Sequence, residues 1–202
     1  HYPSRPSGMS DELYELGYSG TSSSNIAMTS WRSSLLKSLM MWMDDSDSSN
    51  IDRLGHRRWI LNPTMQQTGF GYAVSNSGAA YSSVYVFDYD YHNTDVTGVA
   101  WPATEMPKRY FESSSAWSYS YGSSLNGNVS VKLQCLTTGR ERTWNFSSAA
   151  SDGYFNVDNG GYGQKGCVIF KPDSISIQAG ENYEVTITQD GTVIADYTVH
   201  FF

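Results

Sequence analysis

The stretch Asn50–Ala73, NIDRLGHRRWILNPTMQQTGFGYA, contains a side chain suited to chemistry near neutral pH, the imidazole of His56. Histidine changes its charge between about pH 5 and 8, so it can accept, donate or relay a proton. His56 stands between a polar loop and the short apolar segment Trp59-Ile60-Leu61, which stops at Asn62-Pro63. A histidine at such a junction is held by packed walls and can still face solvent. For a single histidine the favoured interpretation is that it only bridges a helix to a sheet by hydrogen bonds; the alternative is that it belongs to a functional site.

The loop Asp44–Asp52, DDSDSSNID, is rich in carboxylates, which are ligands that Ca²⁺ prefers. An EF-hand loop starting at Asp45 would need glycine at its sixth position and a bidentate glutamate at its twelfth, where this chain has Asn50 and His56. The loop is therefore better interpreted as a solvated turn. A second acidic cluster, at the end of a predicted strand, allows the same two interpretations: Asp88, Asp90 and Asp95.

Two separated pieces, Gly55–Pro63 and Thr68–Ala73, resemble the bacterial branch of the CAP superfamily, with its GHR…ILNP…GxG pattern. That superfamily groups the cysteine-rich secretory proteins, antigen 5 and the plant pathogenesis-related proteins of group one. Upstream, Ser24-Asn25-Ile26-Ala27 is similar to the family's GENIA segment. The resemblance covers roughly the first half of the chain, about residues 1–92, and implies a three-layer α-β-α sandwich. The family usually has a helix before its first histidine, so we expect the natural protein to be longer before His1.

The resemblance also implies a cleft lined by two histidines and two acidic residues. His56 matches the histidine of the GHR motif, and His1 stands where the family has its earlier histidine. Asp45 lies three residues after Trp42, where the family has Trp-x-x-Glu, so a shorter carboxylate takes that place. Ser24 occupies the position of the other glutamate, just before Asn25, and here the chain departs from the pattern. We expect Ser24 and Asn25 to contact the ligand.

Two imidazoles and a carboxylate in one cleft suit two kinds of chemistry. They could bind a divalent ion such as zinc, with His1 and His56 as ligands, or they could form an acid–base pair. Because Ser24 replaces a glutamate, we expect weaker metal binding than in relatives with all four residues, and no required cofactor. The sharpest enzyme hypothesis is hydrolysis by Ser24 with His56 as base and Asp45 orienting it. The chain has no G-x-S-x-G elbow to support that hypothesis.

Periodicity predicts helices and strands that would position these residues. Residues 1–29 read as mostly loop, with one short helix that Ser10 can cap. Trp31, Leu35, Leu39 and Trp42 recur at helical spacing, and we expect this stripe to face the core rather than a ligand. The expected elements of this half are helices at Asp11–Leu16, Ser30–Asp44 and Asp52–Leu61 and strands at Thr68–Val74 and Tyr81–Asp90.

The second half shows no helical period and predicts an all-β sandwich. Thr97–Pro107 reads as a linker, so we expect a CAP-like domain at 1–102 and a β-sandwich domain at 103–202, giving an α+β chain. Trp117, Tyr119 and Tyr121 alternate on one strand face; they could stack on sugar rings, but a wall of the core is favoured. Strands are expected at Ser115–Tyr121, Val129–Leu136, Arg142–Phe146, Cys167–Lys171, Tyr183–Gln189 and Val193–Phe202.

Bulk composition narrows the class of partner. A net charge of -7 and only 13 lysines and arginines argue against nucleic acid, which needs clustered positive charge. No apolar run approaches the roughly 20 residues of a membrane-spanning helix. The high content of Tyr, Trp, Ser, Gly and Asn is typical of extracellular β-rich domains. Cys135 and Cys167 lie in separate predicted strands, as either a disulfide or two buried thiols.

Taken together, these features predict a secreted or cell-surface bacterial protein of CAP-like type. The resemblance implies an extracellular binding or interaction module whose ligand is a lipid, a glycan or another protein. The competing class is a hydrolase, with or without a metal, acting through His1, His56 and Asp45. A third class is a structural wall or adhesion component with no ligand and no activity.

Overall fold

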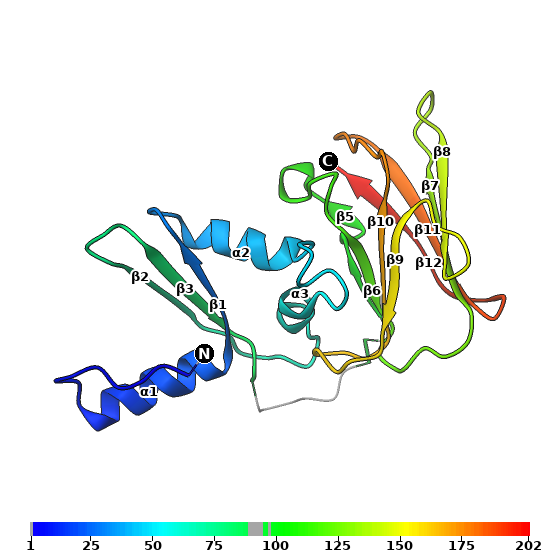
Figure 1. Ribbon diagram of the computed structural model, residues 1–202. Helices are drawn as coiled ribbons and strands as arrows, with labels where there is room; N and C mark the ends of the chain where they lie inside the picture. The colour runs from blue at the N-terminus through cyan, green and yellow to red at the C-terminus, as the bar shows by residue number, and fades with distance from the viewer. Residues whose placement is uncertain (1, 89–94, 97) are drawn as a thin grey trace. The chain divides into compact units, whose positions relative to one another are not determined.

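The computed structural model describes residues 2–88, 95–96 and 98–202 (Figure 1). The chain forms two compact units, and neither is a single run of sequence. The first unit takes residues 1–43 and 62–94, and the second takes residues 44–61 and 95–202. The segment 44–61, which contains His56, therefore belongs to the second unit. The predicted domain division at residue 102 stays a prediction.

The first unit contains a three-stranded antiparallel sheet in the order β1-β3-β2. Its strands are β1 (Ser24–Thr29), β2 (Phe70–Val74) and β3 (Ala80–Tyr85). The turn between β2 and β3 uses Gly78 at φ +89°, and the Gly78 amide donates to the carbonyl of Ser75 at 2.9 Å. The prediction that residues 1–29 are mostly loop is wrong for β1, which is a strand because it pairs with β3 along its whole length.

Two helices accompany this sheet. In α1 (Asp11–Ser22), the Ser10 hydroxyl accepts from the Leu13 amide at 3.3 Å, as the predicted cap requires, but the helix extends six residues beyond the predicted end at Leu16. The second helix, α2 (Leu35–Asp44), begins later than predicted. It buries Trp42, whose indole Nε1 donates to the Ile26 carbonyl, while Trp31 lies 73% exposed before the helix. The expectation of a core-facing stripe therefore holds for its C-terminal part only.

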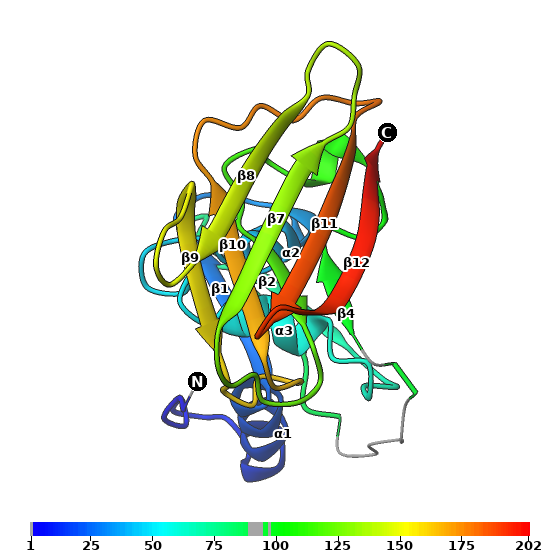
Figure 2. The same cartoon turned by 90° about the vertical axis from the view of Figure 1, so that its right-hand side faces the viewer.

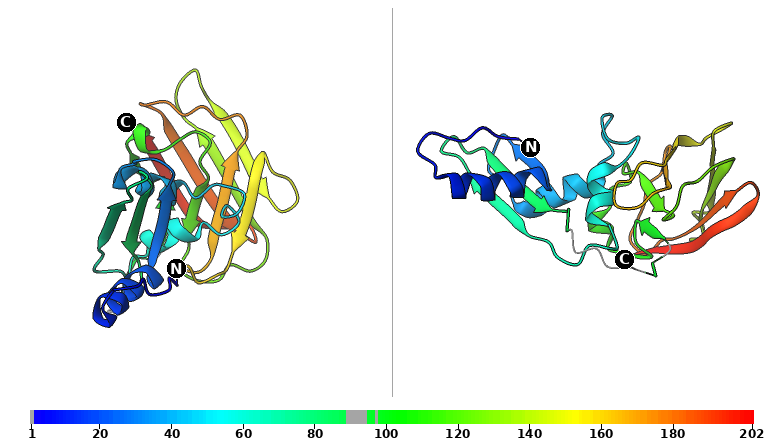
Figure 3. Two further views of the ribbon diagram at one scale, coloured as in Figure 1. Left: turned by 60° about the vertical axis from the view of Figure 1, so that its left-hand side comes forward. Right: turned by 90° about the horizontal axis from the view of Figure 1, so that it is seen from below.

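The second unit contains two sheets. The four-stranded sheet has the order β4-β6-β10-β9, and the five-stranded sheet has the order β5-β12-β11-β7-β8. Figure 2 shows β8, β7, β11 and β12 side by side, and Figure 3 shows β9 in yellow beside β10 in orange. The strands are β4 (Val99–Trp101), β5 (Glu105–Met106), β6 (Trp117–Ser120), β7 (Val129–Cys135), β8 (Arg142–Ser147), β9 (Gly153–Asp158), β10 (Cys167–Pro172), β11 (Asn182–Gln189) and β12 (Thr192–Phe201), with a 3-10 turn η1 (Lys108–Tyr110).

The two sheets share one hydrophobic core, and Trp117 lies in it without solvent exposure. Its indole packs against Phe170 of the four-stranded sheet and Phe201 of the five-stranded sheet, with ring centroids 5.9 Å apart in both pairs. Tyr119 and Tyr121 are partly buried against the same core. The favoured interpretation of these aromatic residues as a core wall is thus confirmed. Both cysteines, Cys135 and Cys167, are free buried thiols.

The segment 44–61 covers the outer face of the four-stranded sheet. Because neighbouring residues of a strand point to opposite faces, Cys167 and Ile169 of β10 point away from the shared core. They form a second buried cluster with Leu54 and Ala116, with Ile51 and Tyr154 packed against it. The short helix α3 (Gly55–Ile60) follows Leu54 directly, so this cluster holds the helix that carries His56.

The observed architecture is a mixed α/β fold, with helices and several sheets in the described part of the chain. Two strands, β4 and β5, occur inside the predicted linker 97–107, because β4 pairs with β6 and β5 pairs with β12. The strand β9 was not predicted at all. None of the helices that the structure describes is long and apolar enough to cross a membrane.

Candidate functional site

Helix α3 receives its N-terminal cap from a residue distant in sequence. The residue at the cap position, Leu54, is buried, has the left-handed φ of +49° and offers no side-chain hydrogen bond. The first amides of a helix need acceptors from elsewhere. Oδ2 of Asp45 supplies one, because it accepts from the backbone amides of His56 at 2.9 Å and Arg57 at 3.4 Å.

The other carboxylate oxygen of Asp45 holds the imidazole. Oδ1 lies 2.8 Å from Nδ1 of His56. The Asp45 side chain is only 2% exposed, whereas that of His56 is 34% exposed. One buried carboxylate therefore fixes both the start of the helix and the orientation of a ring that reaches solvent. The interpretation of the loop Asp44–Asp52 as a solvated turn is therefore wrong for Asp45, since this residue is buried.

This hydrogen bond decides which ring nitrogen carries the proton. An ionised carboxylate only accepts, so the neutral ring of His56 must carry its hydrogen on Nδ1 and leave Nε2 as an acceptor. The hydrogen bond that His56 donates to Asp45 raises the pKa of His56 above its ordinary 6.5. Burial opposes this rise, while the charges of Asp45 and Asp47 add to it and that of Arg53 subtracts from it. The pair thus presents an oriented base that is readily protonated.

Arg57 fastens the helix to strand β6. Its guanidinium is fully buried, and Nη1 donates to the Ala116 carbonyl at 2.8 Å and to the Ser118 hydroxyl at 3.1 Å. Nη2 donates to the carbonyl of Asp44, the neighbour of Asp45. Burial lowers the pKa of Arg57 from its ordinary value to about 10, against the opposing charge of Asp45, so the side chain stays a cation at neutral pH.

Arg58 fastens the same helix on its other side. It is 3% exposed and forms an ion pair with Asp158. Nη2 also donates to the carbonyls of Gly160 and Gln164, at 2.6 Å each, and the guanidinium lies 5.2 Å from the centre of the Tyr162 ring. Sequence reasoning missed both arginines as structural residues. The one signal for them was two cations placed directly before the apolar run Trp59-Ile60-Leu61, where burial is expected.

The other predicted site residues lie in the first unit. Ser24 and Asn25 begin β1 and are both buried. The Ser24 hydroxyl donates to the carbonyl of Gly20 at 2.6 Å, so its proton is engaged within the first unit. His1 lies outside the described residues. The structure therefore brings Asp45 and His56 together, and a cleft that also includes His1, Ser24 and Asn25 stays a prediction.

The acidic residues of the loop do not converge on a cation site. Asp47 accepts from the amide of Ser49 and from the side chain of Asn50, both at 2.9 Å. These hydrogen bonds, that of Asn50 first, lower the pKa of Asp47 to about 2. Both oxygens of Asp45 are already engaged with α3. In the part of the chain that the structure describes, no group of three or more His, Cys, Asp or Glu side chains could hold a metal ion.

In the second acidic cluster, Asp88 is engaged in hydrogen bonds with backbone amides. Asp88 is buried, and its Oδ2 accepts from the amides of Gln66 and Gln67 at 2.9 Å each. It therefore orders the chain between the ILNP segment and β2. Asp90 lies outside the described residues, so the calcium interpretation of this cluster has no support from the structure.

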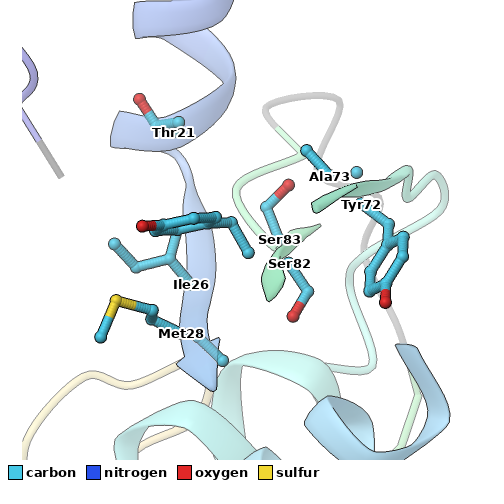
Figure 4. Close-up of a pocket in the computed structure, with 10 residues that line it drawn as sticks. Thr21, Ile26, Met28, Tyr72, Ala73, Ser82 and Ser83 are labelled. Carbon is cyan, nitrogen blue, oxygen red and sulfur yellow. The ribbon is translucent and has the colours of Figure 1, made fainter. Parts of the chain in front are cut away.

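The first unit also carries an open groove of about 520 Å³ along its sheet (Figure 4). Its lining comes from the end of α1 and from one stretch of each strand. Its larger apolar side chains are Ile26, Met28 and Tyr81, with Met28 63% and Tyr81 48% exposed, and Ala73 lies beside them in the lining. The complete lining is Thr21, Ile26, Ala27, Met28, Gly71, Tyr72, Ala73, Tyr81, Ser82 and Ser83.

Comparison with known proteins finds one matching family. Residues 1–89 match the family model described as CAP, the cysteine-rich secretory protein family. This match supports CAP membership, as the GHRRWILNP motif predicts. Proteins of this family are commonly extracellular. No curated protein and no solved structure matches the chain.

Proposed function

We propose that the protein is an extracellular binding module of CAP type whose ligand contacts the imidazole of His56. The observation that carries this proposal is the pair of hydrogen bonds by which Asp45 holds both the ring and the helix that bears it. A fixed ring that is 34% exposed can accept a hydrogen bond at Nε2 when neutral and donate one when protonated. This suits a ligand with a hydroxyl or an acidic group.

The proposal includes the finer architecture and location. We assign the first unit to the three-layer α-β-α sandwich of the CAP family and the two sheets of the second unit to a β-sandwich. Secretion or cell-surface attachment is supported by the family match of residues 1–89. A bacterial source follows from the GHRRWILNP form of the motif.

The groove on the first unit supports an apolar ligand. Ile26, Met28 and Ala73 give it an apolar lining, and hydroxyl groups of Thr21 and Ser83 lie at the same surface. Burial of apolar area is the main source of affinity for such ligands. A lipid is therefore the ligand class to test first, ahead of a glycan or a protein.

The alternative function is hydrolysis with His56 as the general base. It is favoured by one specific observation: a buried aspartate on Nδ1 leaves Nε2 as the proton acceptor, which is the arrangement that a base in acyl transfer needs. The described residues do not fit a metal-assisted version, because both oxygens of Asp45 are engaged with α3 and no three-ligand group is present among them.

One set of measurements separates these functions. Binding is followed by co-sedimentation with phosphatidylcholine vesicles with and without cholesterol, and turnover is followed with p-nitrophenyl acetate and butyrate. We compare the wild type with His56→Ala, with Met28→Lys in the groove, and with Met41→Lys as a control. Met41 is 47% exposed on α2 and does not line the groove.

The binding module predicts that His56→Ala weakens vesicle binding, while Met41→Lys does not. Met28→Lys tests separately whether the groove of the first unit takes a lipid. The hydrolase predicts that His56→Ala abolishes turnover and leaves vesicle binding intact. A wild type with neither binding nor turnover would support the third class, a structural component, and would refute both functions for these probes.

A further inference from the structure

Asp45 occupies a tight turn that its own sequence does not explain. It follows α2 directly and has the left-handed φ of +48°. The backbone carbonyl of the preceding residue, Asp44, accepts two hydrogen bonds. One comes from Nη2 of Arg57 and the other from the Ser46 hydroxyl at 2.7 Å. The Ser46 oxygen in turn accepts from the Ala116 amide at 2.8 Å. The turn that presents Asp45 is therefore built against residues of the second unit's sheet.

Arg57 connects this turn to the strand. Three of its side-chain hydrogen bonds reach the carbonyl of Asp44 on one side and Ala116 and Ser118 on the other. Since the side chain is 0% exposed, water cannot replace these acceptors when one is lost. Ser118 lies in β6 and Ala116 directly precedes it, and β6 is internal to its sheet, between β4 and β10. An internal strand is a rigid anchor.

We propose that Arg57 is a positioning residue for the Asp45–His56 pair, with strand β6 as its anchor. The second unit thereby acquires a role in the site: its four-stranded sheet fixes the turn that carries Asp45, and Asp45 fixes the ring of His56. The proposal rests on the proposed function only in taking His56 as the working group.

Arginine is needed here for its shape. The planar guanidinium offers donors in several directions at once, and it holds Asp44, Ala116 and Ser118 together. A lysine keeps the positive charge but is a single point donor on a flexible stem. The variant Arg57→Lys therefore changes the geometry of the clamp while it keeps the net charge near Asp45.

The test follows the titration and the tautomer of His56 by NMR of the full chain. The charged groups that act on this ring are Asp45, Asp47 and Arg53, and all of them remain in each variant. In the Arg57→Lys variant, we expect the pKa of His56 to be lower than in the wild type. We also expect the Nδ1–H tautomer to be no longer the dominant form of the neutral ring. Ser118→Ala, which removes one acceptor of Arg57, should change both in the same direction by less.

Ser120→Ala is the matched control. Ser120 lies two residues along β6 on the same face as Ser118, is also buried, and approaches the thiol of Cys167. This substitution should leave the pKa and the tautomer of His56 unchanged. The proposal is overturned if His56 has the wild-type pKa and tautomer in both Arg57→Lys and Ser118→Ala. If Arg57→Lys does not fold, the comparison of Ser118→Ala with Ser120→Ala decides alone.

These readouts need no ligand, so the two proposals can fail separately. A changed titration in Arg57→Lys together with unchanged vesicle binding in His56→Ala would keep the positioning role and reject the proposed function. An unchanged titration together with His56-dependent binding would do the reverse.

Discussion

The substitution Asp45→Asn tests whether one carboxylate organises the site. It keeps the shape of the side chain but replaces one oxygen by a donor. The amide oxygen would remain with the backbone amides of His56 and Arg57, now 2.9 and 3.4 Å from Oδ2, because those donors are fixed by α3. The amide nitrogen would then face Nδ1 of His56 and donate to it. We therefore expect the neutral ring to carry its proton on Nε2, the reverse of the wild type.

The energetic cost follows from the same contacts. A hydrogen bond to a charged group contributes about 1.5–3 kcal/mol, but His56 is 34% exposed, so screening reduces this to about 1–2 kcal/mol. The new amide–imidazole bond recovers part of it. The free energy of unfolding should fall by about 1 kcal/mol, and the pKa of His56 should fall as well, because its largest favourable contribution is lost.

The assay combines ring ¹⁵N chemical shifts, which report the tautomer, with urea denaturation at neutral pH. Asp47→Asn is the matched control: Asp47 acts on His56 through charge only and bonds to Ser49 and Asn50 instead. It should lower the pKa of His56 slightly and leave the tautomer unchanged. If Asp45→Asn kept the Nδ1–H tautomer, the ring would not be held by Asp45, and the site described above would be wrong.

Three further predictions concern the same unit. Because folding raises the pKa of His56 above 6.5, the stabilisation that His56 contributes is complete below about pH 6.5 and disappears as the pH rises through the folded pKa. The difference in free energy of unfolding between wild type and His56→Ala, from urea curves at several pH values, should therefore decrease as the pH rises. An increase would contradict the direction of the pKa shift. Arg58→Ala should cost about 3–5 kcal/mol because it leaves buried acceptors and Asp158 unpaired, whereas the exposed Arg53→Ala should cost under about 1 kcal/mol in the same assay. Cys135 and Cys167 are free and buried, and burial raises the pKa of Cys167. A disulfide-exchange reagent should therefore label both thiols only after the protein is unfolded in the absence of reductant. If the unfolded protein is not labelled, the two cysteines form a disulfide.

Strands with a clear alternation of residues were predictable from sequence. In β7, Val129, Val131, Leu133 and Cys135 are buried while Lys132 between them is exposed, and the predicted range was one residue too long. The Ser10 cap was predictable for a similar reason, since it depends on residues only three positions apart. Both signals are local, and local signals can be read without knowing the fold.

The strands that were missed depend on distant pairing. The β1 sequence SNIAMT has few β-branched residues, yet it is a strand because each of its residues faces one in β3. The two-residue strand β5 exists only through its parallel pairing with the end of β12, where Glu105 faces His200. Proline at 102 and 107 made this region read as a linker. Such short strands follow from the sheet and not from their own propensity.

The site shows the same limit more sharply. Asp45 and His56 are 11 residues apart, and the family pattern placed both in one site. The partners of Arg57 and Arg58 are far away in sequence: Ser118 is 61 residues from Arg57, and Asp158 is 100 residues from Arg58. From sequence alone the two arginines were counted only as charge. Their burial follows from acceptors that a single sequence does not mark.

Those acceptors explain why a CAP-family motif lies in the second unit. A buried cation is tolerated only where its donors find acceptors, and Arg57 and Arg58 find theirs in β6 and in the turn 158–164. The segment 44–61 therefore cannot leave this sheet without exposing carbonyls that no longer have donors. Because the same segment presents His56, changes in β6 should act on the imidazole even though no residue of β6 belongs to the CAP-matched range. The two sheets of the second unit, whose strands carry no motif of their own, are in this sense part of the candidate site.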